Sequence, residues 1–181
     1  IWNKDFYMTE ENYTVNLGVD DTSINIAARP SSDLASIDGL GEYDIPAGTT
    51  TIEITVTAES GDERVYKLNV TREASPESRA KDIIITGLVD RVCEGHSGYC
   101  VISPEFNEDT REYTLTVPAG IRDLEFTVIK KHFYEEVVGD GVTKLLPGEN
   151  TVSIEITSED GLHQSVYTYN IIRDITDDNY I

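Results

Sequence analysis

The sequence predicts an all-β protein built from two tandem antiparallel β-sandwiches joined by a short linker. Three observations support this fold class. Alternating apolar and polar residues mark many short strands, with turn signals about every 8 to 12 residues. No stretch shows helical periodicity together with capping residues. The sequence also repeats itself, since Thr51 and Gly61 recur 100 positions later as Thr151 and Gly161.

The repeated element is a β-hairpin, predicted over residues 51–72 and again over residues 151–173. Its apolar residues alternate with polar ones on both sides of a turn signal, which is Glu159–Gly161 in the second copy. The offset between the copies rises from 100 before the turn to 101 after it, where Tyr66 corresponds to Tyr167. Two copies in register predict a tandem repeat rather than a single domain.

The repeat sets the domain boundaries. We expect a first sandwich over residues 1–74, a linker over 75–80, a second sandwich over 81–174 and a tail over 175–181. The second copy contains an opening strand, Asp82–Gly87, that has no counterpart in the first. Two explanations remain open: the sequence begins inside its first domain, or another chain supplies the missing strand. We favour the first explanation.

The remaining expected strands also occur in pairs, one in each copy. Each shows apolar residues at alternate positions, or a short Val and Ile run before a Gly turn. They are residues 12–17, 24–28 and 34–37 in the first copy, and residues 113–117, 124–128 and 136–138 in the second.

The chain is strongly acidic. Of its 181 residues, 34 are Asp or Glu and 14 are Lys or Arg, so the formal net charge is −20. Residues 1–80 carry −9 (6 basic against 15 acidic) and residues 81–181 carry −11 (8 against 19). Binding to DNA, RNA or an anionic membrane surface is disfavoured, because clustered Lys and Arg bind phosphate groups. No apolar run approaches the ~18 residues of a membrane-spanning helix, so membrane insertion is not expected.

Cys93 and Cys100 flank a Gly-containing loop. Their short spacing favours a disulfide formed in an oxidising compartment. Zinc binding by Cys93, His96 and Cys100 is an alternative, although it needs a fourth ligand that the sequence does not supply nearby. Two free thiols are a further alternative.

Aromatic residues outside the alternating pattern define a candidate ligand surface. Five of the ten tyrosines fall on core-facing positions of the expected strands, namely Tyr13, Tyr66, Tyr113, Tyr167 and Tyr169. Tyr99, His132, Phe133 and Tyr134 are not accounted for in this way. We expect these four residues to form an exposed aromatic cluster that could bind a ligand. The three histidines of the chain are expected to be solvated.

No catalytic constellation is predicted. The sequence has no nucleophile-elbow motif and no Ser-His-Asp or Cys-His signature. Paired carboxylates such as Asp20–Asp21 and Glu135–Glu136 are expected from the acidic composition alone. Glycosidase chemistry requires two carboxyl groups held at a defined separation in a cleft. We therefore expect a protein that is not an enzyme.

Each copy combines several weak motifs in the same order. Tyr13 follows Phe6 by seven positions, as Tyr113 follows Phe106, and a Pro-containing turn, the hairpin and a closing Arg come later. The order and spacing resemble those of the cadherin-like β-sandwich domain, which is repeated in secreted and surface proteins of bacteria. The resemblance covers nearly the whole chain. It implies a seven-stranded immunoglobulin-like sandwich and a non-enzymatic extracellular role.

The resemblance also raises the question of calcium, because cadherins bind Ca²⁺ between domains through clustered acidic motifs. The nearest candidates are Asp177–Asn179 and the linker residues Glu73 and Glu77. Their spacing does not match a site that sets six to eight oxygen ligands around one ion. We expect no metal and no cofactor, with Ca²⁺ as a less favoured alternative.

The expected function is that of a structural or adhesion spacer in an extracellular or cell-surface protein. Its partners would be neighbouring domains of the same protein. The alternative is a carbohydrate- or protein-binding accessory module of a secreted multidomain protein, with a cell-surface glycan or protein as the ligand. An exposed aromatic platform on a flat sheet face would favour the alternative, and a rigid end-to-end arrangement of the two domains would favour the spacer.

Overall fold

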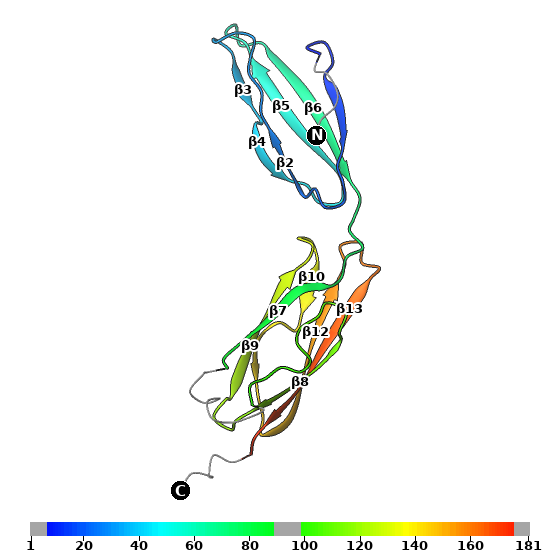
Figure 1. Ribbon diagram of the computed structural model, residues 1–181. Coiled ribbons are helices and arrows are strands. Elements are labelled where there is room, and N and C mark those ends of the chain that lie inside the picture. The colour runs from blue at the N-terminus through cyan, green and yellow to red at the C-terminus, as the bar shows by residue number, and fades with distance from the viewer. Residues whose placement is uncertain (1–6, 89–98, 176–181) are drawn as a thin grey trace. The chain divides into compact units, whose positions relative to one another are not determined.

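The computed structural model describes residues 7–88 and 99–175, and every regular element in these ranges is a β-strand (Figure 1). The chain divides into two compact units, Ile1–Ser75 and Pro76–Ile181. The predicted all-β fold class is confirmed. The boundary between the units lies at the start of the segment predicted as the linker.

The two units contain the same strands in the same order, with one difference at the start. In the first unit the strands are β1 (Asn12–Asn16), β2 (Ser23–Ile26), β3 (Ser36–Asp38), β4 (Gly41–Asp44), β5 (Gly48–Thr57) and β6 (Glu63–Arg72). In the second unit they are β7 (Ala80–Thr86), β8 (Glu112–Val117), β9 (Asp123–Lys130), β10 (Glu136–Val138), β11 (Gly141–Lys144), β12 (Gly148–Thr157) and β13 (Gln164–Arg173). Strands β1 to β6 correspond to β8 to β13, and β7 has no counterpart among the described residues of the first unit.

Each unit is built around one long antiparallel hairpin, β5–β6 in the first and β12–β13 in the second. In both hairpins ten residues of one strand face ten residues of the other, as the sequence predicts. The turn of the second hairpin holds one residue more: Ser158 N donates to the His163 carbonyl, where Ala58 N donates to the Asp62 carbonyl in the first. This extra residue accounts for the change of offset from 100 to 101.

Two sheets enclose the core of each unit. The hairpin sheet has the strand order β1-β6-β5-β3 in the first unit and β10-β12-β13-β8 in the second. The opposite sheet consists of β2 and β4 in the first unit and of β11, β9 and β7 in the second. The second unit therefore has the seven strands that the family resemblance implies, whereas six are described in the first.

One sheet edge in each unit is parallel, within sandwiches whose other pairings are antiparallel. Strand β1 pairs with β6, and β8 pairs with β13, in the parallel direction. Parallel strands need a long connection, and here the rest of the unit supplies it. Alternation in the sequence shows which face a strand buries, but not the direction of a partner far away in the chain.

Sequence periodicity also misses β4 and β11 and places β3 too early. Leu34, which the pattern includes in a strand, is 67% exposed and precedes β3. Strands β4 and β11 have four residues each, of which only two are half-buried. Two inward residues are too few for alternation to stand out from the surrounding turn residues.

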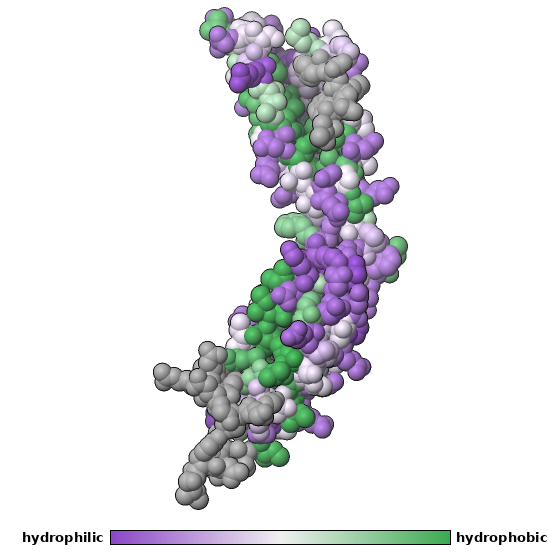
Figure 2. All heavy atoms as spheres, viewed as in Figure 1, coloured by the Kyte–Doolittle hydropathy of each residue, from purple (hydrophilic) through white to green (hydrophobic). Residues whose placement is uncertain are grey.

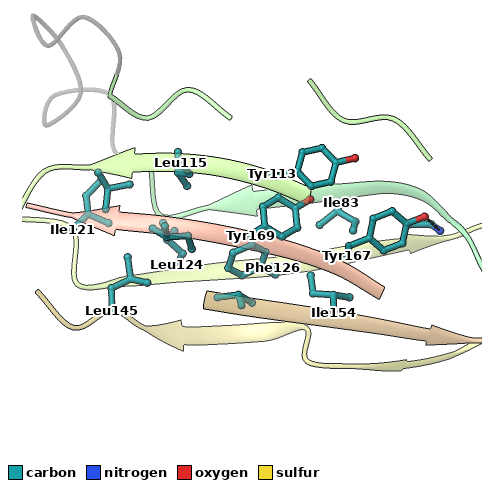
Figure 3. Packing of buried hydrophobic residues seen from close by; sticks show 14 of the residues in the cluster. Ile83, Tyr113, Leu115, Ile121, Leu124, Phe126, Leu145, Ile154, Tyr167 and Tyr169 are labelled. Atoms are coloured by element: carbon teal, nitrogen blue, oxygen red, sulfur yellow. Dashed lines mark hydrogen bonds between the residues drawn. The ribbon is translucent and has the colours of Figure 1, made fainter. Parts of the chain in front are cut away.

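The core of the second unit is centred on three aromatic rings (Figure 3). The ring centroids of Tyr113 and Tyr169 are 4.8 Å apart, and those of Phe126 and Tyr169 are 5.2 Å apart. Pairs at such separations contribute about 0.5–1.5 kcal/mol beyond their buried area. Aliphatic residues from both sheets complete the core, among them Ile83, Leu115, Val117, Leu124, Val152, Ile154, Ile156 and Ile171.

A closing arginine fastens the last strand of each unit. Arg72 at the end of β6 is 1% exposed, and its Nε donates to the carbonyl of Ile45 at 2.8 Å. Arg173 at the end of β13 donates to the carbonyls of Ala119 at 3.0 Å and Leu145 at 3.1 Å. Hydrogen bonds from charged donors contribute about 1.5–3 kcal/mol each. The arginines thus hold the last strand to loops that begin far away in the sequence.

Gly139→Ala is expected to destabilise the second unit strongly. Gly139 has a φ of 92°, and an added Cβ would lie 2.1 Å from the Ser153 carbonyl oxygen in β12. Strand β12 would have to shift, so we expect a loss of about 3 kcal/mol or more in the free energy of unfolding, measured by urea denaturation.

Gly141→Ala is the matched control. Gly141 has a φ of 93°, but an added Cβ would meet nothing within 4 Å. The variant carries only the backbone strain, about 1–2 kcal/mol. Equal losses in the two variants would contradict the close approach between Gly139 and Ser153.

Candidate functional site

The loop of residues 131–135 connects β9 to β10 at the end of the second unit where the chain enters β7. Hydrogen bonds to His132 help to hold its turn. Glu135 N donates to the His132 carbonyl at 3.3 Å, and Tyr134 N donates to His132 Nδ1 at 3.4 Å. The 131–135 loop brings together three of the four residues of the predicted ligand surface, His132, Phe133 and Tyr134.

Phe133 is the exposed member of this group. It is 66% exposed, and its ring stands at 89° to that of Tyr134, with the centroids 4.9 Å apart. Tyr134 is half-buried, and His132 is only 5% exposed. The expectation that the histidines are solvated is wrong for His132, because the loop places its ring inside, 6.3 Å from the ring of Tyr134.

Tyr99 lies at the opposite end of the second unit. Its hydroxyl donates to Asp174 Oδ2 at 2.5 Å, and Asp174 directly follows β13. The 131–135 loop leads instead into Glu136, which faces Thr157 at the other end of the hairpin. Tyr99 is therefore not part of the aromatic cluster. Sequence alone does not show at which end of a sandwich a loop lies.

A network of ion pairs joins the loop to the start of the second unit. Arg79 holds Glu77 through two hydrogen bonds of 2.9 Å and reaches Glu108 at 3.1 Å. Lys131 Nζ lies 2.7 Å from Glu108 and 3.6 Å from Glu77. The hydrogen bonds from Arg79 lower the pKa of Glu77 to about 2, and the hydrogen bond to Glu108 raises the pKa of Lys131. Residues predicted as linker are thereby fixed to the second unit.

Glu135 is a buried carboxyl group that sequence reasoning treated as a product of composition. It is 2% exposed, and its Oε2 accepts a hydrogen bond from Lys131 N at 3.1 Å. Its Oε1 is buried and has no hydrogen-bond partner among the described residues. Burial raises the pKa of Glu135, although two backbone hydrogen bonds oppose the shift. No sequence signal distinguishes it from the many exposed acids of the chain.

The predicted disulfide and metal sites fall largely outside the described residues, which exclude Cys93, His96 and Asp177–Asn179. Cys100 is half-buried, packs against the core, and has a φ of 57°. The disulfide stays a prediction. Within residues 7–88 and 99–175, no group of three or more His, Cys, Asp or Glu side chains is placed to hold a metal ion. No helix in the same ranges is long and apolar enough to cross a membrane.

The arrangement around the 131–135 loop suits contact with a surface better than proton transfer. Phe133 offers an exposed ring next to a half-buried tyrosine, a combination that packs against apolar side chains or sugar rings. The neighbouring carboxylates and cations of Glu77, Arg79, Glu108 and Lys131 already neutralise one another. They form a polar margin to the aromatic group, as at the rim of many interfaces.

Comparison with known proteins identifies a family for the first unit. The family model of the cadherin-like beta sandwich domain matches residues 3–73. This match confirms the family predicted from the motifs. The second unit repeats the strands β1 to β6 as β8 to β13. No curated protein matches the chain.

Among solved structures, the chain is similar to Drosophila N-cadherin EC1-3, with a TM-score of 0.33 and 6% identity over 90% of this chain. It spans 63% of that protein chain. It is also similar to the fibronectin(III)-like modules of Clostridium thermocellum CbhA, with a TM-score of 0.27 and 9% identity over 95% of this chain and 93% of that one. A third similar structure is protocadherin gammaB7 EC3-6, with a TM-score of 0.26 and 14% identity over 94% and 47%.

Glu135→Gln is expected to stabilise the second unit at pH 7. A carboxyl group with a raised pKa in the folded state contributes its full stability below its unfolded pKa of about 4.5, and that stability is lost as the pH rises through the folded pKa. Removing the buried charge should therefore raise the free energy of unfolding by about 1–2 kcal/mol at pH 7 and change little at pH 4. Urea denaturation at both pH values measures the difference.

Glu136→Gln serves as the control, because it removes the same charge from the exposed neighbouring position. Glu77 affects stability over a different pH range. Because its pKa is lowered in the folded state, it contributes stability above pH 4.5, and this stability is lost as the pH falls towards 2. If Glu135→Gln and Glu136→Gln gave the same change at pH 7, the buried carboxylate would not be the cause.

Proposed function

The first unit belongs to the cadherin-like beta sandwich domain family, and on this premise we propose that the chain is a non-enzymatic spacer that bears load between neighbouring domains of an extracellular or cell-surface protein. The family supports a structural or adhesion-type module. The observation that carries the proposal is the parallel pairing of the first hairpin-sheet strand with the last strand in each unit. Its mechanical consequence follows from the direction of the strands.

In the first unit the parallel pair joins the first and last described strands, β1 and β6, so force along the chain pulls them in opposite directions along their common axis. In the second unit force enters through β7, which pairs with β9, and it pulls β8 and β13 in the same opposed way once it is passed on from β7. Five pairs of residues resist sliding in the first unit and six in the second. When the two strands are pulled along their axis in opposite directions, all hydrogen bonds between them bear the force together. When force instead separates two paired residues at one end of the ladder, the hydrogen bonds break one at a time.

The closing arginines strengthen the same geometry. Arg72 and Arg173 stand at the ends of β6 and β13, where force enters the last strand. Arg173 joins this position to the loop after β8 through Ala119 and to the loop after β11 through Leu145. The load is thereby shared with segments outside the parallel pair.

The net charge of the chain and its two cysteines fit a spacer in an extracellular location. A net charge of −20 keeps neighbouring modules soluble and mutually repulsive. A disulfide between Cys93 and Cys100 would belong to an oxidising, extracellular location. This role requires no binding partners other than the neighbouring domains.

The alternative function is a carbohydrate- or protein-binding accessory module, and one observation favours it. Phe133 is exposed and stands perpendicular to Tyr134, with an ion-pair network beside it. Saturable binding of a glycan or protein that Phe133→Ala weakens at least tenfold would favour the accessory module. The same variant would leave the mechanical strength of the spacer unchanged.

Force spectroscopy tests the spacer directly. With the chain pulled from its two ends, we expect two separate unfolding events, one for each unit. With handles placed instead at residues 149 and 174, beside the paired ends of β12 and β13, the second unit should unfold at a clearly lower force, because the ladder then opens one pair at a time.

Arg173→Met is the matched variant for this measurement. It should lower the unfolding force of the second unit and leave that of the first unit unchanged, since Arg72 still closes the first. Equal unfolding forces in the two pulling directions would contradict a load-bearing role for the parallel pair.

The proposed role does not depend on calcium. The acidic residues of the chain lack the spacing of a six- to eight-oxygen site, so excess CaCl₂ should not raise the thermal unfolding midpoint above that in EDTA. A rise that saturates with Ca²⁺ concentration would show a bound ion, and the spacer would then be stiffened by metal.

A further inference from the structure

The outer face of the hairpin sheet carries the same three polar residues in both units, opposite one another on three adjacent strands. Residues next to them in sequence, such as Leu68 and Ile171, point into the core, so these polar side chains point outward. We call this set the Thr–Asn–Thr row. It consists of Thr14, Asn69 and Thr51 on β1, β6 and β5, and of Thr114, Asn170 and Thr151 on β8, β13 and β12.

The Thr–Asn–Thr row is retained although the outward residues on both sides of it have changed. In the two adjacent rows all six positions differ between the units. One adjacent row is Asn12, Lys67 and Glu53 in the first unit and Glu112, Thr168 and Ser153 in the second. The other is Asn16, Thr71 and Thr49 in the first unit and Thr116, Ile172 and Glu149 in the second. The shared fold does not explain this difference, because all three rows belong to the same strands.

Strand stability does not explain the asparagine. Asn is depleted in β-strands, yet Asn69 and Asn170 occupy β6 and β13, which are inner strands of their sheets. In each unit the Asn Oδ1 accepts a hydrogen bond from the neighbouring threonine, at 2.8 Å from Thr51 and at 3.5 Å from Thr151. The Nδ2 amide of each Asn donates to no residue that the structure describes. A residue that breaks a local preference without a structural return is expected at a functional site.

In the second unit the Thr–Asn–Thr row lies in a shallow hollow with a volume of about 250 Å³. Pockets for drug-sized ligands have volumes of roughly 300–1,000 Å³, so this hollow suits a single ring. Hydrophilic residues gather along the side of the second unit where β12 and β13 lie, whereas apolar residues gather over β7 and β9 (Figure 2). Besides the row, the hollow is lined by Thr116, Glu149 and Ile172, among others.

The groups that line the hollow match a neutral sugar. Sugar hydroxyls both donate and accept hydrogen bonds, and the row offers an amide donor and hydroxyls beside the carboxylate of Glu149. Ile172 is 49% exposed and offers an apolar contact for the C–H face of a ring. Among the described residues, no Lys, Arg or His lines the hollow, and Glu149 repels anions. Phosphates and acidic sugars are therefore disfavoured.

We propose that the Thr–Asn–Thr row of the second unit binds one neutral hexopyranose ring. Asn170 Nδ2 donates to one sugar hydroxyl, Glu149 accepts from another, and Ile172 contacts the ring. The row of the first unit has the same amide and hydroxyls, but Thr49 and Thr71 stand in place of Glu149 and Ile172. It therefore binds the same sugar more weakly.

This site goes beyond the spacer role and is separate from the aromatic group at Phe133. The 131–135 loop leads into Glu136, which faces Thr157 on β12. Thr151 lies six positions before Thr157 on the same strand, about 20 Å away at the rise of a β-strand. The side chains of the row take no part in the backbone ladder between β8 and β13, so a bound sugar does not alter the mechanical role.

NMR titration of the intact 181-residue chain at neutral pH tests the site. The probes are the methyl glycosides of glucose, galactose and mannose, each added to about 50 mM. At least one of them should shift the side-chain amide signal of Asn170 saturably, with a Kd of about 1–10 mM. The methyl glycoside of glucuronic acid should cause no shift, because Glu149 repels its carboxylate. Absence of a saturable shift with all three neutral glycosides would overturn the proposal.

Asn170→Thr separates binding from structure. Thr is a better strand residue than Asn, so the variant should keep or raise the thermal unfolding midpoint while the sugar Kd rises at least tenfold. A purely structural role for Asn170 predicts the reverse, a lower midpoint with unchanged binding. Asn25→Thr is the matched control, because it makes the same change at an exposed position of β2 and should leave binding unchanged.

Two further variants keep the result specific. Glu149→Ala alters an exposed residue, so the chain should fold normally, and the sugar Kd should rise about fivefold or more. Phe133→Ala should leave binding at the row unchanged. Sugar binding that survives both Asn170→Thr and Glu149→Ala, or that Phe133→Ala abolishes, would overturn the proposed site. The unfolding force of the second unit should be the same in Asn170→Thr as in the unaltered chain, so failure of the sugar site and failure of the spacer can be told apart.

Discussion

The long hairpin of each unit is the structure on which the rest depends. Its ten-residue ladder is local in sequence, so the chain pays little loop-closure entropy to form it. Once formed, it offers two free edges, and β3 or β10 occupies one while β1 or β8 occupies the other. Its inner face then supplies the surface on which the opposite sheet packs. The closing arginines fasten the end of the same hairpin to distant loops.

The opposite sheet decides how complete each core is. Three strands cover the second unit, and its central rings are almost fully buried. Two strands of the described residues cover the first unit, and several equivalent residues there are half-buried. The same hairpin sequence pattern therefore sits in two environments.

At the charged end of the second unit, two glutamates differ in a way that the acidic composition of the chain does not reveal. Glu77 and Glu135 are both glutamates in a very acidic chain, yet the pKa of one is lowered and that of the other is raised. Arg79 causes the first shift, and loss of water causes the second. The ion pairs fix the segment that enters β7, and the buried carboxyl of Glu135 belongs to the same loop as the exposed Phe133. An aromatic contact surface and a well-anchored chain entry therefore share one end of the unit.

The sequence by itself determined the tandem repeat, the two hairpins and their turns, the all-β class and the family of the first unit, because alternation and turn residues act over a few neighbouring positions. It also marked the opening strand around Ile83 as present in one copy only. Tertiary structure alone decided that β1 and β8 pair in parallel, that Glu135 and His132 are buried, and that Tyr99 lies away from Phe133. These features depend on which distant strands meet and at which end a loop lies, and such long-range pairing leaves no local pattern in the residues involved.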